Sequence, residues 1–347
     1  MEMKYNLSEV SFIRPLLIIL VVLYHAFAPF TGTWREFVGF VPNEAYRYIA
    51  DISYSSMLET FVFISGYVFS YQCLYLNKNY SLKQLCIKKG KRLLLPYLIF
   101  GFIYLLLFGD IGNKGFHYTV SELLGGVGHL WFLMMLFWCF IALWFLTKIR
   151  LNDISLLMIT LLIAICSPIG KFFQIGSAMY YLLYFFLGWL FFKHHKAVHQ
   201  FVTRNTLIVL AILYFFAFLF FPKGAGILKS HSIQHTDLSL FSNACLMGSM
   251  RMLRISYSFL GVLFYYCISI KITSKYSLNQ HIVSYGKLCL GVYIFQQFVL
   301  QFLYYRTSLP IVVGPYVLPW VGFGIALLVS TFMTYLVRLS LIGKRLL

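Results

Sequence analysis

Charged residues are scarce in this sequence, and several familiar signatures are missing from it. Asp, Glu, Lys and Arg make up 11% of the chain, hydrophobic residues make up 61%, and the mean hydropathy is +0.80. This composition leaves no soluble domain of useful size. The seven cysteines form no Cys-x-x-Cys pair, so we interpret them as apolar packing residues. A phosphate-binding glycine loop is also absent from the sequence.

The sequence has instead a series of long apolar runs. A helix needs about 20 apolar residues to span a bilayer. We therefore predict an all-α integral membrane fold, with about ten transmembrane helices in a single bundle that forms one domain over residues 1–347. The predicted spans are 11–30, 52–74, 93–109, 129–147, 154–170, 177–192, 205–222, 255–270, 288–305 and 316–337. Residues 237–254 are less clear, and three interpretations stay open: a re-entrant helix, an interfacial helix or part of an eleventh span.

The basic residues predict an orientation, because Lys and Arg are retained on the cytoplasmic side of a membrane. With the N-terminus inside, the inner connections hold about twice as many basic residues as the outer ones. Both termini are therefore expected to be cytoplasmic. The net charge of +18 follows mostly from this topology and from attraction to anionic lipid, and we do not interpret it as a nucleic-acid surface.

Arg14 and His25 are the most informative pair in the sequence. Both lie in the first apolar run, RPLLIILVVLYHAF, which has no small-residue cleavage site and is interpreted as a retained helix. Eleven residues are almost three helical turns, so the two side chains share a face and lie roughly 16 Å apart along the axis. Ionisable groups are costly inside a bilayer, and two on one face indicate a polar track through it.

Further motifs follow in order along the chain. They are FVFISGY at 61–67, KKGKRLLLPY at 88–97, GHLWFL at 128–133, YFFLGWLFF at 184–192 and YGKLCLGVYIFQQFVL at 285–300. Together with the Arg-x10-His spacing, this series resembles the membrane-bound acyltransferase-3 family over nearly the whole chain. The resemblance implies transfer of an acyl group, usually acetyl, from cytoplasmic acyl-coenzyme A to a carbohydrate or glycolipid hydroxyl at the outer face. Acetyl-CoA or another acyl-CoA would be the co-substrate, and no metal is implied.

The sequence departs from the family pattern at two positions. The basic motif begins with Lys89 where the family has Arg, which loses a bidentate fork but keeps a charge that can hold phosphate. The late motif ends in Gln296 where a histidine is common, which removes a titratable group. We assign Gln296 at most a polar role in the core.

The donor site is expected near the inner end of the first helix. Coenzyme A carries several phosphates, and Arg14, Lys89 and Arg92 are the cations that would hold them. Positive-inside anchoring is the alternative for Lys89 and Arg92. Ser65, followed by glycine, would let the backbone approach the acyl arm, or would simply pack helices together.

His25 is the candidate general base, because a hydroxyl needs a base to become a good nucleophile. A core histidine bonded to a carbonyl is the alternative, and an acyl-histidine route stays open. Glu59 is the only carboxylate well within a predicted span, and its estimated depth matches that of His25. It either forms a carboxylate–histidine dyad with His25 or pairs with a tyrosine, an arginine or a backbone amide for structural reasons.

Candidate acceptor contacts lie toward the outer side. Glu122 could meet a hydroxyl, and His129 and Trp131 could meet a sugar ring, although an interfacial aromatic belt explains the tryptophan equally well. Arg251 and Arg254 share a helical face and would suit a pyrophosphate or acidic sugar, or anchor to lipid phosphates.

These observations favour a multi-pass acyltransferase in a bacterial inner or plasma membrane, whose partners are a surface carbohydrate or glycolipid and membrane lipids. A rival function is transport of polysaccharide or lipid-linked sugar, because polar residues also line permeation paths. No inverted repeat, which transport would favour, is evident in the sequence. A purely structural membrane partner leaves the buried charges unexplained.

Overall fold

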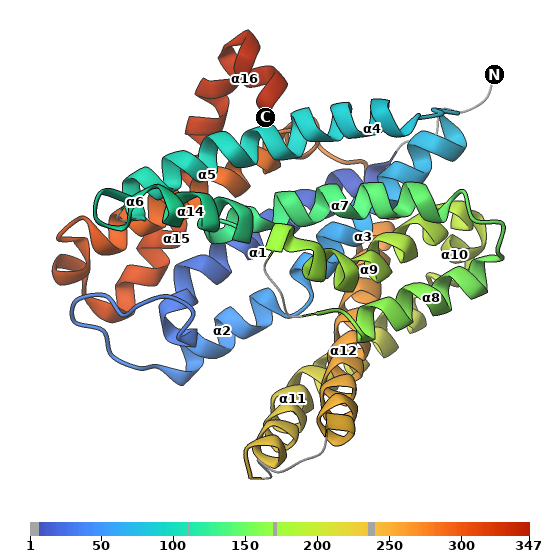
Figure 1. Ribbon diagram of the computed structural model, residues 1–347, viewed down its shortest axis with the longest axis horizontal. Helices are drawn as coiled ribbons and strands as arrows, with labels where there is room; N and C mark the ends of the chain where they lie inside the picture. The colour runs from blue at the N-terminus through green and yellow to red at the C-terminus, as the bar shows by residue number, and fades with distance from the viewer. Residues whose placement is uncertain (1–6, 110, 169–171, 235–239) are drawn as a thin grey trace.

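The protein is helical along its length in the computed structural model, which describes residues 7–109, 111–168, 172–234 and 240–347 (Figure 1). No strand occurs within these ranges. The first eight α-helices are α1 (Ser8–Phe27), α2 (Glu44–Tyr54), α3 (Met57–Ser70), α4 (Leu82–Lys89), α5 (Leu95–Phe108), α6 (Ile111–Gly125), α7 (Trp131–Leu146) and α8 (Asp153–Ile165). The others are α9 (Ile175–Lys193), α10 (His195–Phe201), α11 (Arg204–Gln234), α12 (Leu240–Lys275), α13 (Gln280–Tyr285), α14 (Cys289–Tyr305), α15 (Leu309–Leu339) and α16 (Leu341–Leu346).

Five short helical segments join these elements. They are η1 (Ala28–Thr31), η2 (Tyr71–Tyr75), η3 (Gly90–Leu94), η4 (Gly128–Leu130) and η5 (Phe172–Gln174). Two of them, η2 and η3, have the wider turn of a π-helix, which is frequent at functional sites. Side-chain hydrogen bonds cap the first turns of other helices. The Asn152 side chain accepts a hydrogen bond from Ser155 N–H at 2.8 Å and caps α8, for example.

Basic connections gather at one end of the molecule. The start of α4, the turn between α7 and α8, and α10 lie at the right-hand end of Figure 1, whereas α2 and α6 lie toward the other end. The hairpin of α11 and α12 projects away from both, at the bottom of the view. The molecule therefore has a basic end, near residues 78–92, 148–153 and 193–204, which the sequence predicts to face the cytoplasm.

Helix α1 lies at the centre of the helices that matter for the site. It packs against α2, α3, α12, α14 and α15. It runs parallel to α14, because Tyr304 near the end of α14 donates a 2.7 Å hydrogen bond to the Ala26 carbonyl, while Ser11 lies beside Gly286 near its start. The two helices therefore begin and end at similar depths.

The backbones of α3 and α9 touch at two glycines. A Cβ atom on Gly66 would lie 1.9 Å from the Phe185 carbonyl oxygen, and one on Gly188 would lie 1.9 Å from the Phe63 carbonyl oxygen. Neither position can accept a side chain without moving a helix. The FVFISGY and YFFLGWLFF motifs are therefore partners in one close helix crossing.

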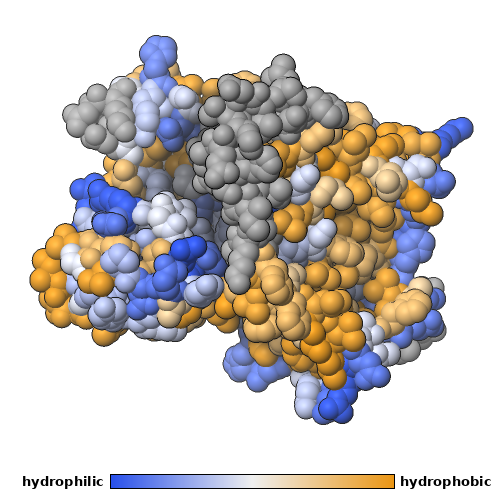
Figure 2. Space-filling view, turned by 90° about the horizontal axis from the view of Figure 1, so that it is seen from below, coloured by the Kyte–Doolittle hydropathy of each residue, from blue (hydrophilic) through white to orange (hydrophobic). Residues whose placement is uncertain are grey.

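Exposed apolar side chains cover the outside of the bundle. Leu98, Phe102 and Leu106 on α5 are about half exposed and recur every four residues, so they form one outward stripe. Leu328, Phe332 and Leu336 form the same pattern on α15. Figure 2 shows hydrophobic residues over much of the right half of one face, with hydrophilic residues gathered at its right-hand edge. Such a surface fits a protein embedded in lipid.

The helix lengths confirm several spans but not ten. Within the described ranges, six helical stretches are long and apolar enough to cross a membrane, or seven if the bent pair of α10 and α11 counts as one span. Two shorter apolar helices, α8 and α14, fall below that length. The predicted number of ten came from apolar runs alone, and hydropathy does not show where a run breaks into shorter helices. The cytoplasmic placement of both termini stays a prediction.

The described part of the segment at 237–254 has a structure that differs from all three interpretations. Residues 237–239 lie outside the described residues, but 240–254 continue without a break into the following span as the first part of α12. The polar residues in this segment interrupted the apolar run without interrupting the helix.

Candidate active site

One large cavity opens among the helices around the end of α1. Its volume is about 1270 Å³, and its walls come from α1, α2, α3, α5, α6, α7, α9, α12 and α14. Six residues that the sequence singled out line it: His25, Glu122, His129, Trp131, Arg251 and Arg254. These residues are scattered over more than 200 positions of sequence, and the fold brings them to one place.

His25 lies in the last turn of α1 and faces this cavity. Its ring stacks on Trp34 with the centroids 5.8 Å apart and meets the edge of the His129 ring at 5.9 Å. Its Nδ1 atom is buried and has no hydrogen-bond partner. Because His25 lines the cavity while Nδ1 is buried, Nε2 is the nitrogen available to a ligand there.

His129 is held by three contacts from α14. Its backbone N–H donates to Gln297 Oε1 at 3.0 Å, its Nε2 lies 3.0 Å from the Ile294 carbonyl, and its own carbonyl accepts from the Tyr293 hydroxyl. A carbonyl only accepts, so Nε2 carries the proton and Nδ1 keeps its lone pair. The late motif therefore works by fixing His129. The family motif points to Gln296, but its neighbour Gln297 is the residue that binds the His129 backbone.

Gln296 is fully buried and makes only a long contact. Its amide nitrogen lies 3.5 Å from the Tyr293 carbonyl, and its Oε1 has no partner. This agrees with a polar role in the core. The position that commonly holds a family histidine thus lies one residue away from the glutamine that binds His129.

Glu59 pairs with Arg254 and Ser258. Its Oε1 lies 3.5 Å from an Arg254 guanidinium nitrogen and accepts a 3.3 Å bond from the Ser258 hydroxyl. No carboxylate pairs with His25 in the part of the chain that the structure describes. The expected dyad is therefore not formed, and the alternative of an arginine pair is. The physical reason is that a guanidinium is always charged and binds a buried carboxylate more strongly than a neutral imidazole does.

Arg251 lies one helical turn before Arg254 and binds the end of α8. Its guanidinium donates to the Ser167 carbonyl at 2.9 Å, to the Ser167 hydroxyl and to the Ala164 carbonyl at 3.4 Å. These acceptors carry no full charge. In contrast to Arg254, Arg251 therefore faces the cavity with its positive charge uncompensated by a described carboxylate.

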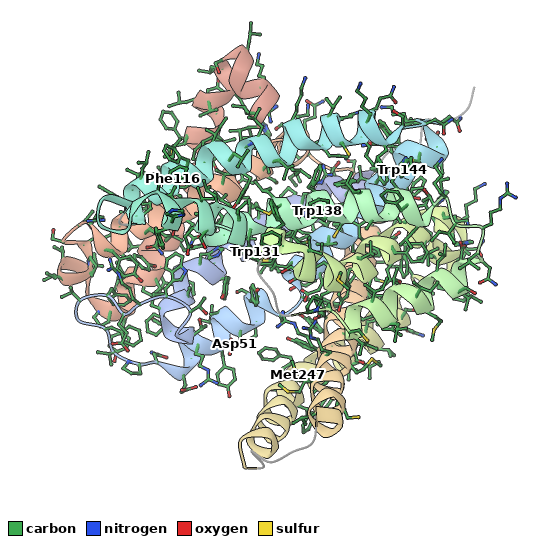
Figure 3. The ribbon with its side chains drawn as sticks, viewed as in Figure 1. Asp51, Phe116, Trp131, Trp138, Trp144 and Met247 are labelled. Carbon is green, nitrogen blue, oxygen red and sulfur yellow. The ribbon has the colours of Figure 1, made fainter. Side chains whose placement is uncertain are left out.

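Trp131 and Glu122 complete the predicted acceptor contacts. Trp131 is the first residue of α7, and its ring lies 6.2 Å from that of Tyr181 across the cavity wall. In Figure 3 it lies near the middle of the view, with Trp138 and Trp144 farther along the same helix toward the right-hand end. Among the described residues, Glu122 on α6 is the only carboxylate that lines the cavity. Its role as an acceptor contact stays a prediction.

Arg14, Lys89 and Arg92 lie together outside this cavity. The charges of Arg14 and Lys89 both interact with that of Arg92, and none of the three forms an ion pair with a described carboxylate. Lys89 is 7% exposed, with Nζ 3.5 Å from the centroid of the Phe140 ring, whereas Arg92 is exposed. Three neighbouring cations without an anion are suited to bind phosphate groups.

Ser65 donates its hydroxyl to the Phe61 carbonyl at 2.9 Å, within its own helix. Its neighbour Gly66 makes the close contact with α9. The packing interpretation of this pair thus has a direct structural basis, and contact of Ser65 with an acyl arm stays a prediction.

The comparison with protein families agrees with this geometry. A family model described as an acyltransferase domain matches residues 7–339, which is nearly the whole chain. No curated protein and no solved structure gives a match. Motif residues of α1, η4, α7 and α14 line the cavity, and Arg14, Lys89 and Arg92 form the group of cations at the other end of α1. The chain belongs to the membrane-bound acyltransferase-3 family, and it is an acyltransferase.

Proposed function

We propose that the protein transfers an acyl group, acetyl in the first instance, from acyl-coenzyme A to a hydroxyl of a surface carbohydrate or glycolipid. The donor would bind at the cytoplasmic end of α1 and the acceptor in the cavity at the outer face of a bacterial inner or plasma membrane. The observation that carries this proposal is the position of His25, at a cavity that collects six motif and acceptor candidates.

The cation group supports donor binding at the other end of the helix. Arg14 and Arg92 would contact the phosphates of coenzyme A, with the buried amine of Lys89 close to both. Arg14 and His25 are roughly 16 Å apart along α1. The pantetheine arm of coenzyme A separates its phosphates from its thiol by a distance of this order, so one donor molecule can reach both.

The cavity supports a large polar acceptor. Its volume of about 1270 Å³ exceeds the usual range of small-ligand pockets, roughly 300–1,000 Å³. Aromatic rings that can stack on a sugar line it, including Trp34 and Trp131. Both features fit an oligosaccharide better than a small metabolite.

The proposed reaction moves one proton and replaces the carbon–sulfur bond of the thioester with a carbon–oxygen bond. The imidazole of His25 accepts the proton of the acceptor hydroxyl at Nε2 while the oxygen forms a bond to the thioester carbon and the carbon–sulfur bond breaks. The imidazolium then returns the proton to the coenzyme A thiolate. In the alternative route, His25 itself carries the acyl group before the sugar does.

Mass spectrometry of surface glycans from cells with and without the gene tests this function. We expect acylated sugars to disappear in the deletion strain and to return with the wild-type gene but not with His25→Ala. Unchanged acylation together with lost polymer export would contradict the proposal and favour transport. Rapid quenching of the purified enzyme with labelled acetyl-CoA separates the two routes, because only the second gives a labelled peptide that contains His25.

A further inference from the structure

The cavity has an excess of positive charge that transfer to a neutral sugar does not require. The described residues of its lining include Arg35, Arg251, Arg254 and Arg306, but only one carboxylate, that of Glu122. Arg254 is paired with Glu59 behind the wall, and the other three arginines have no ion-pair partner among the described residues. Even after both carboxylates are counted, two positive charges remain.

Each of the three unpaired arginines is held in place by neutral groups. Arg35 lies with its guanidinium carbon 4.2 Å from the centroid of the Tyr305 ring, and Arg306 donates to the Leu107 carbonyl at 3.3 Å. Arg251 binds the Ala164 and Ser167 carbonyls. A guanidinium has five N–H donors, so these contacts leave donors free on every one of them. Positioned arginines with free donors are the usual receptors for oxyanions.

The arginines belong to the same site as the catalytic candidate. The Tyr305 ring that holds Arg35 lies 6.5 Å from the ring of Trp34, and Trp34 stacks on His25. Arg251 lies with its guanidinium carbon 5.7 Å from the Tyr180 ring on the α9 wall of the cavity. An acceptor that presents a hydroxyl to His25 is therefore surrounded by this positive charge.

We infer that the acceptor is an anionic saccharide, which carries a phosphate or carboxylate that Arg35, Arg251 and Arg306 bind while the hydroxyl faces His25. The oxyanion belongs either to an acidic sugar or to the diphosphate of a lipid-linked sugar. The inference rests on the proposed function only for the identity of the cavity as the acceptor site.

Isothermal titration calorimetry of the full-length protein in phosphatidylcholine nanodiscs tests this inference. Coenzyme A is present at saturation, so that the phosphate sites near Arg14 are filled. The probes are a uronic-acid disaccharide, farnesyl diphosphate and a neutral disaccharide of matched size. We expect at least one anionic probe to bind at least about tenfold more tightly than the neutral one. The better anionic probe identifies the source of the oxyanion.

Variants assign that selectivity to the arginines. Arg35→Gln and Arg306→Gln alter exposed side chains, so the fold is not at risk, and the double variant is expected to lose most of the anionic preference. Arg251→Gln should do the same if it folds. Arg47→Gln is the matched control, because Arg47 is also exposed but pairs with Glu44 and Asp51 on α2, and it should change nothing.

Two outcomes would overturn the inference. One is equal binding of neutral and anionic probes, or an anionic preference that survives the double variant. The other is loss of probe binding when the nanodiscs contain phosphatidylglycerol, which would assign the arginines to bilayer phosphates. Failure of coenzyme A itself to bind contradicts the proposed function, and the comparison of the wild-type protein with the double variant then still tests the inference.

Discussion

The two ends of α1 handle charge in opposite ways. At the His25 end, the polar groups are held by other parts of the protein: α14 fixes His129, and Glu59 neutralises Arg254. At the Arg14 end, three cations lie together with no described anion, one of them buried against Phe140. The residues next to His25 are thus positioned by the protein itself, although Arg35, Arg251 and Arg306 of the same cavity have no ion-pair partner among the described residues, whereas the cations at the Arg14 end gain stability from an anionic ligand. The His25 end therefore holds reactive side chains in fixed positions, whereas the Arg14 end is suited to attract an anion.

The largest expected effect is at the His25 end of α1. We predict that His25→Ala lowers turnover by about 10²–10⁴-fold, the usual contribution of a general acid–base group. Coenzyme A affinity should stay unchanged, because the phosphates bind at the other end of the helix. Steady-state turnover and calorimetry on one preparation check this. His281→Ala, at an exposed position on α13, is the control. Full activity of His25→Ala would remove the proposed base.

The opposite pattern is expected at the Arg14 end. Arg14→Ala and Arg92→Ala should each weaken acetyl-CoA binding by about 1–3 kcal/mol, as a charged hydrogen bond is lost. Titration with acetyl-CoA measures this, and a saturating donor concentration should restore most of the turnover. Lys91→Ala changes an exposed neighbour of Arg92 and should have little effect. If both arginine variants bind the donor normally, the group serves only membrane topology.

Two neighbouring glutamines sharpen the comparison within α14. Gln297→Met removes the acceptor for the His129 N–H and should lower turnover by about 1–3 kcal/mol of activation free energy, because a buried donor loses its partner. Gln296→Met removes an oxygen that has no partner, so turnover should stay within a factor of about two. Kinetics of the two variants side by side check this. Equal losses would show that His129 is not positioned by Gln297.

The smallest expected effect on catalysis concerns Glu59. Because this carboxylate pairs with Arg254 and not with His25, Glu59→Gln should lower the melting temperature without shifting the pH profile of turnover. Thermal unfolding and a pH–rate series measure the two quantities. Glu44→Gln breaks an exposed ion pair on α2 and should change neither. A shifted pH profile would restore the histidine–carboxylate dyad.

The sequence could predict whatever depends on residues close together along one helix. The spacing of Arg14 and His25 on one helix and the position of His129 and Trp131 at the end of an apolar run are local facts, and three of these residues, His25, His129 and Trp131, line one cavity. The partners of Glu59 and His129 were not predictable in this way, because they are 195 and 168 residues away and depend on helix packing. The same limit explains why ten apolar runs did not translate into ten long helices.

The glycine contact between α3 and α9 also determines which walls of the cavity can move. Where two backbones touch at Gly66 and Gly188, no side chain lies between them that could change its rotamer and let the helices slide. Glu59 on α3 and Tyr180 on α9 therefore keep their relative positions during a catalytic cycle. Two walls of the cavity are therefore held at a fixed spacing by the contact between two backbones.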